Sequence, residues 1–245
     1  MAKHAATLAT APQLPQVIIG FCHPDTVDAN FTVSLSRLLL GGRGRIANII
    51  AARSGPRIAT ARNDIVRTFL KTNADWLFML DTDMVFEPEA FWCLLDAADK
   101  DERPIVGALA FIAGGLTAPV RTNMMVWDKD DDGDLVLRSV IGYPDDGLCR
   151  VASTGAACLL VHRSALLRIQ EKYGTLVHPW FQETTNEKYE WGEDVTFCVR
   201  AGQCGIPVYV HTGVEFGHMK KVALGSSDFA PFREPMAEEV GDAAG

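Results

Sequence analysis

Hydrophobic residues along the chain fall into short continuous runs that alternate with runs of helical period. Apolar segments at 17–21, 46–50, 76–80 and 105–111 have the length and composition of strands buried on both faces. Between them, apolar positions recur every three to four residues, which predicts helices around Phe31, Ile58 and Pro88. This alternation predicts an α/β fold with a mostly parallel central sheet and helices on both faces.

The second half of the chain begins with an insertion rich in Gly, Pro and Asp, from about 114 to 155. Within it we expect one hairpin that pairs 123–127 with 135–139. A core strand (157–162), a helix (164–173), a second helix (193–204) and a last strand (208–211) follow. A chain of 245 residues suits one sizeable core, so we expect a single domain with flexible tails at 1–15 and about 226–245.

The charge balance excludes one class of partner. With 31 acidic and 23 basic residues the net charge is −8, which is opposite to what binding a nucleic-acid backbone requires. An acidic protein that binds a diphosphate must neutralise it locally, and a divalent cation does so. No apolar stretch approaches the length of a membrane span, and the six cysteines show no CxxC spacing. We therefore expect a cytoplasmic protein with reduced thiols and no membrane span.

The segment Asp81-Thr82-Asp83 is the strongest chemical signal. Other Asp pairs with this spacing exist, such as Asp99 and Asp101, but only Asp81 and Asp83 directly follow an apolar strand. In a parallel sheet, ligands bind beyond the carboxyl ends of the strands. Carboxylates there can hold manganese or magnesium against a diphosphate, so all three residues are candidates for nucleotide binding. The alternative is that the two carboxylates cap the following turn.

Trp191-Gly192-Glu193-Asp194 begins the predicted helix at 193–204. Acidic side chains are favoured at a helix N-terminus, so capping alone could explain the two acids. An aromatic residue and a glycine before them also suit a loop that stacks on a sugar. In that interpretation Asp194 is the general base and Glu193 holds the acceptor. The preceding segment around Trp180 either lines an acceptor groove or anchors a loop in the core.

Basic residues and histidines near the predicted strand ends complete the candidate site. His218 lies after the last strand, and a neutral imidazole suits a carboxylate site for manganese better than one for magnesium. Lys220 and Lys221 follow it and either close over the phosphates or form a solvated pair. Arg62 either reaches the nucleotide or pairs with Asp81. On position alone, His23 and Arg53 are further candidates for nucleotide contacts.

Two motifs resemble ligand-binding loops without meeting their requirements. Residues 128–133 match the first half of a calcium-binding loop, but Ser139 occupies the twelfth position, where a glutamate is needed. We interpret this segment as a hairpin turn. The glycine-rich stretch at 40–45 follows a helix rather than the first strand, which indicates a helix C-cap and a turn.

These motifs, in this order, resemble the GT-A fold glycosyltransferases, especially the family-2-like enzymes of bacteria and bacteriophages. The similarity covers about residues 17–220 and rests on ATARND, WLFMLDTDMVFEP, TGAACLLVHRSAL, the WGED helix and a late histidine. It implies that Asp81 contacts the ribose and the metal, that Asp83 and His218 bind the metal, and that Asp194 is the base of an inverting enzyme. The WGED segment is similar to the WGGED element of galactosyl- and N-acetylgalactosaminyl-transferases but has one glycine fewer.

The sequence thus predicts a metal-dependent glycosyltransferase with a UDP- or GDP-linked donor, and manganese as the expected cation. A retaining glycosyltransferase, a sugar nucleotidyltransferase and a non-catalytic carbohydrate-binding domain are the alternatives. Acceptor classes that stay open are protein hydroxyls, lipids and other glycans. The oligomeric state leaves no signal in the sequence.

Overall fold

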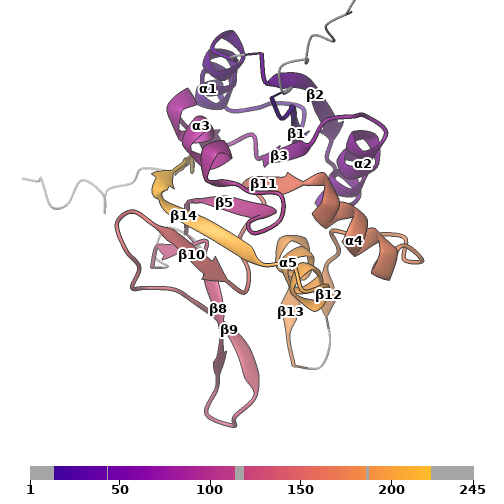
Figure 1. Ribbon diagram of the computed structural model, residues 1–245. Helices are drawn as coiled ribbons and strands as arrows, with labels where there is room; N and C mark the ends of the chain where they lie inside the picture. Colours follow the sequence, from indigo (N-terminus) through magenta and orange to yellow (C-terminus); the bar gives the residue numbers. More distant parts are fainter. Residues whose placement is uncertain (1–13, 43, 114–118, 186–187, 222–245) are drawn as a thin grey trace, which may run out of the picture.

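The central sheet determines where every functional side chain lies. The computed structural model describes residues 14–42, 44–113, 119–185 and 188–221, so the predicted tails fall almost entirely outside the described residues. Among these residues the sheet has the order β10 (Leu148–Val151), β14 (Val208–Glu215), β5 (Ile105–Leu109), β11 (Cys158–His162), β3 (Trp76–Leu80), β1 (Val17–His23) and β2 (Ile46–Arg53) (Figure 1). Strands β10 and β11 run against the others, so the sheet is mostly parallel, as predicted.

Helices cover both faces of this sheet (Figure 1). They are α1 (Ala29–Leu40), α2 (Ile58–Leu70), α3 (Pro88–Ala97), α4 (Arg163–Tyr173) and α5 (Glu193–Gln203). The side chains of β3 alternate between the two faces: Trp76, Phe78 and Leu80 pack with α1 and α3, whereas Leu77 and Met79 pack with α2 and α4. All five are buried, which explains why this strand is a continuous apolar run.

The insertion contributes to the sheet, which the sequence analysis did not predict. Strand β10 pairs antiparallel with β14, and β14 itself continues to Glu215, beyond the predicted end at His211. Strand β10 lies at the edge of the sheet and is buried only at Val151, and β14 beside it alternates between buried and more exposed residues. Strand β10 and the second half of β14 therefore lack the continuous apolar runs that identify the central strands in the sequence.

Short strand pairs lie outside the central sheet. The predicted hairpin is confirmed, with its first strand two residues later than expected: β8 (Met125–Lys129) pairs with β9 (Leu135–Ser139), and the turn contains Gly133 at φ 83°. A second hairpin consists of β12 (Thr184–Thr185) and β13 (Glu190–Trp191) and directly precedes α5. The β8–β9 and β12–β13 hairpins project from the same end of the molecule (Figure 1). A further short pair outside the central sheet joins β6 (Phe111–Ile112) to β7 (Arg121–Thr122).

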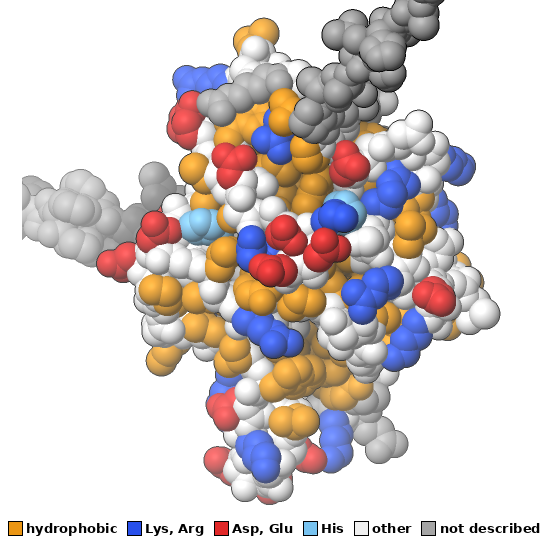
Figure 2. All heavy atoms as spheres, in the orientation of Figure 1, with side chains coloured by type: hydrophobic (Ala, Val, Ile, Leu, Met, Phe, Trp, Pro, Cys, Tyr) orange, Lys and Arg blue, Asp and Glu red, His pale blue; other side chains and the backbone are white. Residues whose placement is uncertain are grey.

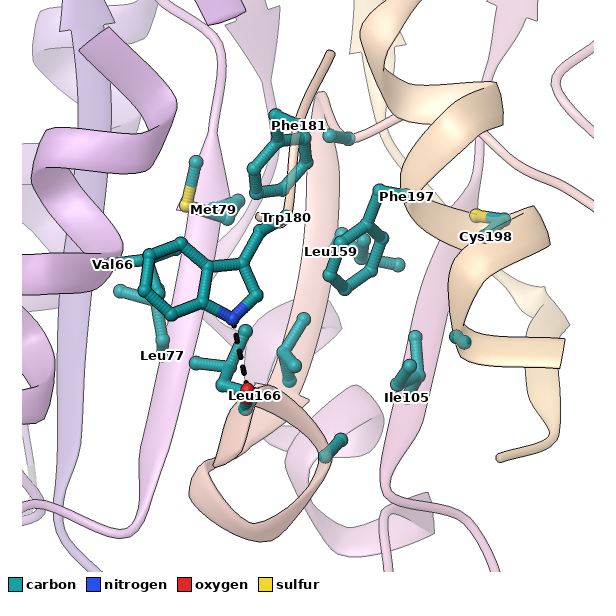
Figure 3. Packing of buried hydrophobic residues seen from close by; sticks show 14 of the residues in the cluster. Val66, Leu77, Met79, Ile105, Leu159, Leu166, Trp180, Phe181, Phe197 and Cys198 are labelled. Carbon is teal, nitrogen blue, oxygen red and sulfur yellow. Dashed lines mark hydrogen bonds between the residues drawn. The ribbon is translucent and has the colours of Figure 1, made fainter. Parts of the chain in front are cut away.

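Trp180 lies in the core and not in a surface groove. Its side chain is 1% exposed, and its indole Nε1 donates a hydrogen bond to the carbonyl oxygen of Leu166 at 2.9 Å. Figure 3 shows the ring enclosed by apolar side chains, with Phe181 and Phe197 nearby. The hypothesis that Trp180 binds an acceptor is therefore wrong, and the alternative, a loop anchored in the core, is correct. A large aromatic ring is favoured there because it fills the space between α2, α4 and the sheet.

We predict that Trp180→Ala lowers the free energy of unfolding by about 3–5 kcal/mol, because it removes a buried indole and leaves a cavity. Urea denaturation followed by circular dichroism measures the change. Ile141→Ala is the control, since that side chain is 96% exposed and should change stability by less than about 0.5 kcal/mol. A loss below about 1 kcal/mol for Trp180→Ala would contradict the burial of this ring.

Candidate functional site

Asp81, Thr82 and Asp83 form a tight connection at the carboxyl end of β3. The Asp81 N–H donates to the carbonyl of Ala157 at 2.9 Å, which ties the connection to the residue before β11. Beyond it, β4 (Met84–Val85) pairs with β15 (Gly217–His218), which brings the end of the described chain to the same place. The buried strand thus fixes two carboxylates at the rim of the sheet, as the sequence predicted.

Arg62 joins the two acidic motifs. It lies on α2, its side chain is 3% exposed, and its Nη2 donates to both carboxylate oxygens of Asp81 at 2.8 and 3.1 Å. Its Nη1 donates to Glu193 Oε1 at 2.6 Å. Burial alone would lower the pKa of Arg62, but the neighbouring carboxylates outweigh it and raise this pKa above its usual value. Arg62 therefore orients the carboxylates of Asp81 and Glu193. This agrees with the alternative that Arg62 pairs with Asp81.

Asp83 and His218 face each other across the β4–β15 pair. His218 Nε2 lies 3.0 Å from Asp83 Oδ2, and its Nδ1 lies 3.0 Å from the carbonyl oxygen of Phe111. The Lys220 ammonium lies 2.6 Å from His218 Nε2 and 3.3 Å from Asp83 Oδ2. Burial of Asp83 opposes ionisation, but the hydrogen bond from His218 and the charge of Lys220 lower its pKa overall. Two of the three predicted metal ligands, Asp83 and His218, thus already contact an ammonium group.

A cavity of about 610 Å³ opens beside these carboxylates. Its wall includes Asp81, Thr82, Asp83 and Lys220, which were all candidates from the sequence. Further wall residues are Thr26, Val27 and Asp28 between β1 and α1, Ala29 at the start of α1, and Ser54 after β2. Sequence reasoning missed these residues, although their position directly after β1 and β2 could have indicated them.

Two nucleotide-binding candidates lie beside the cavity and not in its wall. His23 Nδ1 is 2.8 Å from the carbonyl oxygen of the next residue, Pro24. Arg53 is exposed and pairs with Asp25 at 2.5 Å. Both residues end their strands next to wall residues, so the strand-end rule points to the region of the cavity but not to the side chains that line it.

The Trp191–Asp194 segment holds its two acids in different environments. Gly192 caps α5, and a side chain built on it would come within 3.0 Å of Asp194 Oδ1, so glycine leaves room for this carboxylate. Glu193 is paired with Arg62, and burial raises the pKa of its carboxyl group although Arg62 opposes the rise. Asp194 Oδ1 accepts from the N–H of Val195 at 2.8 Å. Of the pair, Asp194 has the carboxylate that is not committed to Arg62.

One face of the molecule has no single sign of charge (Figure 2). On the face shown in Figure 2, acidic and basic side chains are interspersed among apolar ones. Such a distribution gives no continuous positive field to attract a polyanion. In the part of the chain that the structure describes, no helix is long and apolar enough to cross a membrane. Within the same residues, His, Cys, Asp and Glu side chains do not form a group of three or more that could hold a metal by themselves.

Known structures resemble this chain in fold. A197 from STIV matches with a TM-score of 0.51 at 15% identity, and the match covers 84% of this chain and 86% of the other. GalNAc-T7 with UDP, GalNAc and Mn2+ matches with a TM-score of 0.56 at 12% identity, covering 86% of this chain and 45% of that one. CMP:2-keto-3-deoxy-manno-octonic acid synthetase complexed with CTP is more distant, with a TM-score of 0.44 at 12% identity over 89% of this chain and 96% of the other.

No protein-family model and no curated protein matches the sequence. The structural matches at this level of identity define the architecture and nothing more. The chain has a GT-A fold, with a seven-stranded, mostly parallel sheet among its described residues.

We predict that Arg62→Met destabilises the protein by about 3–5 kcal/mol, because it leaves two partly buried carboxylates without their partner and removes a buried side chain. Urea denaturation measures this loss. Arg67→Met is the matched control on the same helix, since that side chain is 40% exposed and should change stability by less than about 0.5 kcal/mol.

A triple variant separates the two ways in which Arg62→Met can lower stability, which are unpaired charge and lost packing. Adding Asp81→Asn and Glu193→Gln to Arg62→Met removes the unpaired charges and should restore part of the stability. No recovery in the triple variant would mean that Arg62 stabilises the fold through packing and not through its charge.

Proposed function

We propose that this protein is a metal-dependent glycosyltransferase that transfers a sugar from a nucleoside-diphosphate donor to an acceptor hydroxyl. The observation that carries the proposal is the convergence of Asp83, His218 and Lys220 beside the cavity, next to the pair that buried Arg62 forms with Asp81. The site lies beyond the carboxyl ends of the sheet, where open α/β sheets bind nucleotides. The GT-A fold adds support at the level of architecture.

The donor atoms present suit a divalent cation. One carboxylate oxygen and one imidazole nitrogen, 3.0 Å apart, form a partial ligand set for manganese, and the oxygens of a diphosphate and of water can complete it. Asp81 was predicted as a further ligand, but both of its oxygens accept from Arg62. We therefore assign the metal to Asp83 and His218, and we assign Asp81 and Thr82 to the nucleotide. The cation would neutralise the charge on the departing diphosphate.

Lys220 competes with that cation, because its ammonium is already within 3.3 Å of both ligands. We predict that Lys220→Gln increases the affinity for Mn²⁺ in the absence of nucleotide, on the order of two- to fivefold. This factor corresponds to the free energy of one exposed ion pair. Electron paramagnetic resonance of free Mn²⁺ measures the affinity. Lys221→Gln is the matched control and should leave it unchanged. Weaker Mn²⁺ binding by Lys220→Gln would show that Lys220 supports the metal site.

Asp194 is the proposed general base. It takes the proton of the acceptor hydroxyl while that oxygen forms a bond to the anomeric carbon and the bond from this carbon to the diphosphate breaks. Glu193 is less suited to this role because Arg62 holds its carboxylate. Its position next to Asp194 and Trp191 instead supports a role in fixing the acceptor side of the site. This arrangement favours inversion, and a retaining reaction is the alternative.

We expect the protein with Mn²⁺ to release nucleoside diphosphate from one UDP- or GDP-linked sugar, as measured by chromatography. Asp194→Asn should bind the same donor but lose transfer by about 10²-fold or more, the usual contribution of a general base. Glu171→Gln is the control, because this exposed carboxylate lies on α4 and does not line the cavity. Near-normal transfer by Asp194→Asn would indicate retention or a different base.

A sugar nucleotidyltransferase would instead consume a nucleoside triphosphate and release pyrophosphate. The glycine-rich stretch that could serve such a reaction lies at the wrong end of the sheet: the Val17 N–H donates to the Arg45 carbonyl, at the amino end of β1. Gly41 is the C-cap of α1, in agreement with the C-cap interpretation of this stretch. Pyrophosphate release from CTP or UTP with a sugar or sugar phosphate would overturn the glycosyltransferase proposal.

A further inference from the structure

A second hollow lies outside the cavity described above, between the β8–β9 hairpin and the segment from Lys188 to Val195. Its volume is about 720 Å³, which is within the range of ligand-binding pockets. Neither hairpin belongs to the central sheet, so its position is not required to complete the main core. We refer to this hollow as the hairpin groove.

Two sets of contacts hold the walls of the hairpin groove. Tyr189 stacks on Trp191 with ring centroids 3.8 Å apart and an angle of 11°, and Trp127 of β8 meets Trp191 edge-on at 5.9 Å. Lys188 Nζ pairs with Asp134 Oδ2 at 2.7 Å. The aromatic cluster and the ion pair join the two hairpins at separate places. These contacts connect the two hairpins, so the groove lies between joined walls and not between unconnected loops.

The chemistry of the walls combines apolar surface with carboxylates. Leu135 is 66% exposed and Tyr189 is 36% exposed, so sizeable apolar groups remain in contact with water. The carboxylates of Asp130, Asp134 and Glu190 lie in the same walls and outnumber the ammonium of Lys188. This excess of negative charge disfavours phosphate-bearing ligands. It favours neutral ligands that donate hydrogen bonds, because carboxylates only accept them.

The groove extends to residues that flank the proposed base in the sequence. Gly192 and Val195 are wall residues, and Asp194 lies between them in the sequence at the start of α5. The five residues of β9 span about 17 Å, which exceeds the length of a single sugar ring. A chain-like ligand in the groove can therefore place one end at Asp194 and make further contacts along the hairpin.

We propose that the hairpin groove binds the acceptor and that the acceptor is a glycan chain. A pyranose has an apolar face of C–H groups that packs on an aromatic ring, and a rim of hydroxyl groups that donate to carboxylates. The groove offers both kinds of partner, in Tyr189 and Trp191 and in Glu190 and Asp130. This inference rests on the proposed function. It assigns the acceptor specificity to the β8–β9 insertion and not to the nucleotide cavity.

The test uses the full chain with Mn²⁺ on an array of immobilised cellobiose, maltose, lactose, N,N′-diacetylchitobiose and their longer homologues. Lysine-rich and serine- and threonine-rich peptides form a second arm. We expect glycans of at least one linkage class to bind, and Tyr189→Ala to weaken this binding by roughly tenfold or more, as for a central aromatic contact. Tyr189→Phe should retain binding because it keeps the ring. Leu176→Ala, which replaces a 43% exposed side chain outside the groove, should have no effect.

Thermal unfolding with UDP and GDP, measured on the same samples, separates the two proposals. A nucleotide-dependent shift that survives in Tyr189→Ala shows that this variant is folded and that the donor site is intact. With that shift present, the glycan proposal is overturned if the array captures no saccharide, if only peptides bind, or if Tyr189→Ala binds glycans like the wild type. An absent shift in the wild type would overturn the proposed function itself, whatever the array shows.

Discussion

The buried guanidinium of Arg62 is the interaction on which the arrangement of this site depends. It contacts Asp81 after β3 and Glu193 at the start of α5, two residues far apart in the sequence. A guanidinium stays ionised when buried and offers donors in a fixed planar fork, so it can orient two carboxylates at once. The end of the central strand and the start of the last helix are thereby held in one geometry.

This coupling divides the site into two sides. The cavity beside Asp83 and His218 suits a nucleoside diphosphate with its cation, whereas the groove beside Asp194 suits an acceptor. Lys220 bridges Asp83 and His218, so the negative charge of the donor side is already compensated without a metal. In the reaction that we propose, the donor and the acceptor meet between the cavity and the groove, next to the carboxylates of Asp81 and Glu193 that Arg62 holds.

Several of these features were predictable from the sequence because they depend on local rules. The buried strand β3 is a continuous apolar run, and the polar residues directly after it must lie at the edge of the sheet. Trp180 was ambiguous for a physical reason: an aromatic residue in a polar, proline-containing segment suits a binding loop and a core anchor equally. Only the three-dimensional packing against Leu166 decides between them. The hairpin groove was not predictable, because its walls meet through contacts such as Trp127 with Trp191 that have no sequence signature.

Calorimetry of nucleoside diphosphate binding tests the central claim most directly. UDP and GDP are titrated into the wild type, Asp83→Asn and Asp101→Asn, each with Mn²⁺ and with a chelator. Asp101 belongs to the other Asp pair, and its exposed side chain makes it a matched control. We predict that one nucleotide binds with Mn²⁺, that the chelator abolishes binding, and that of the two variants only Asp83→Asn loses binding. Equal binding with and without Mn²⁺, or full binding by Asp83→Asn, would contradict it.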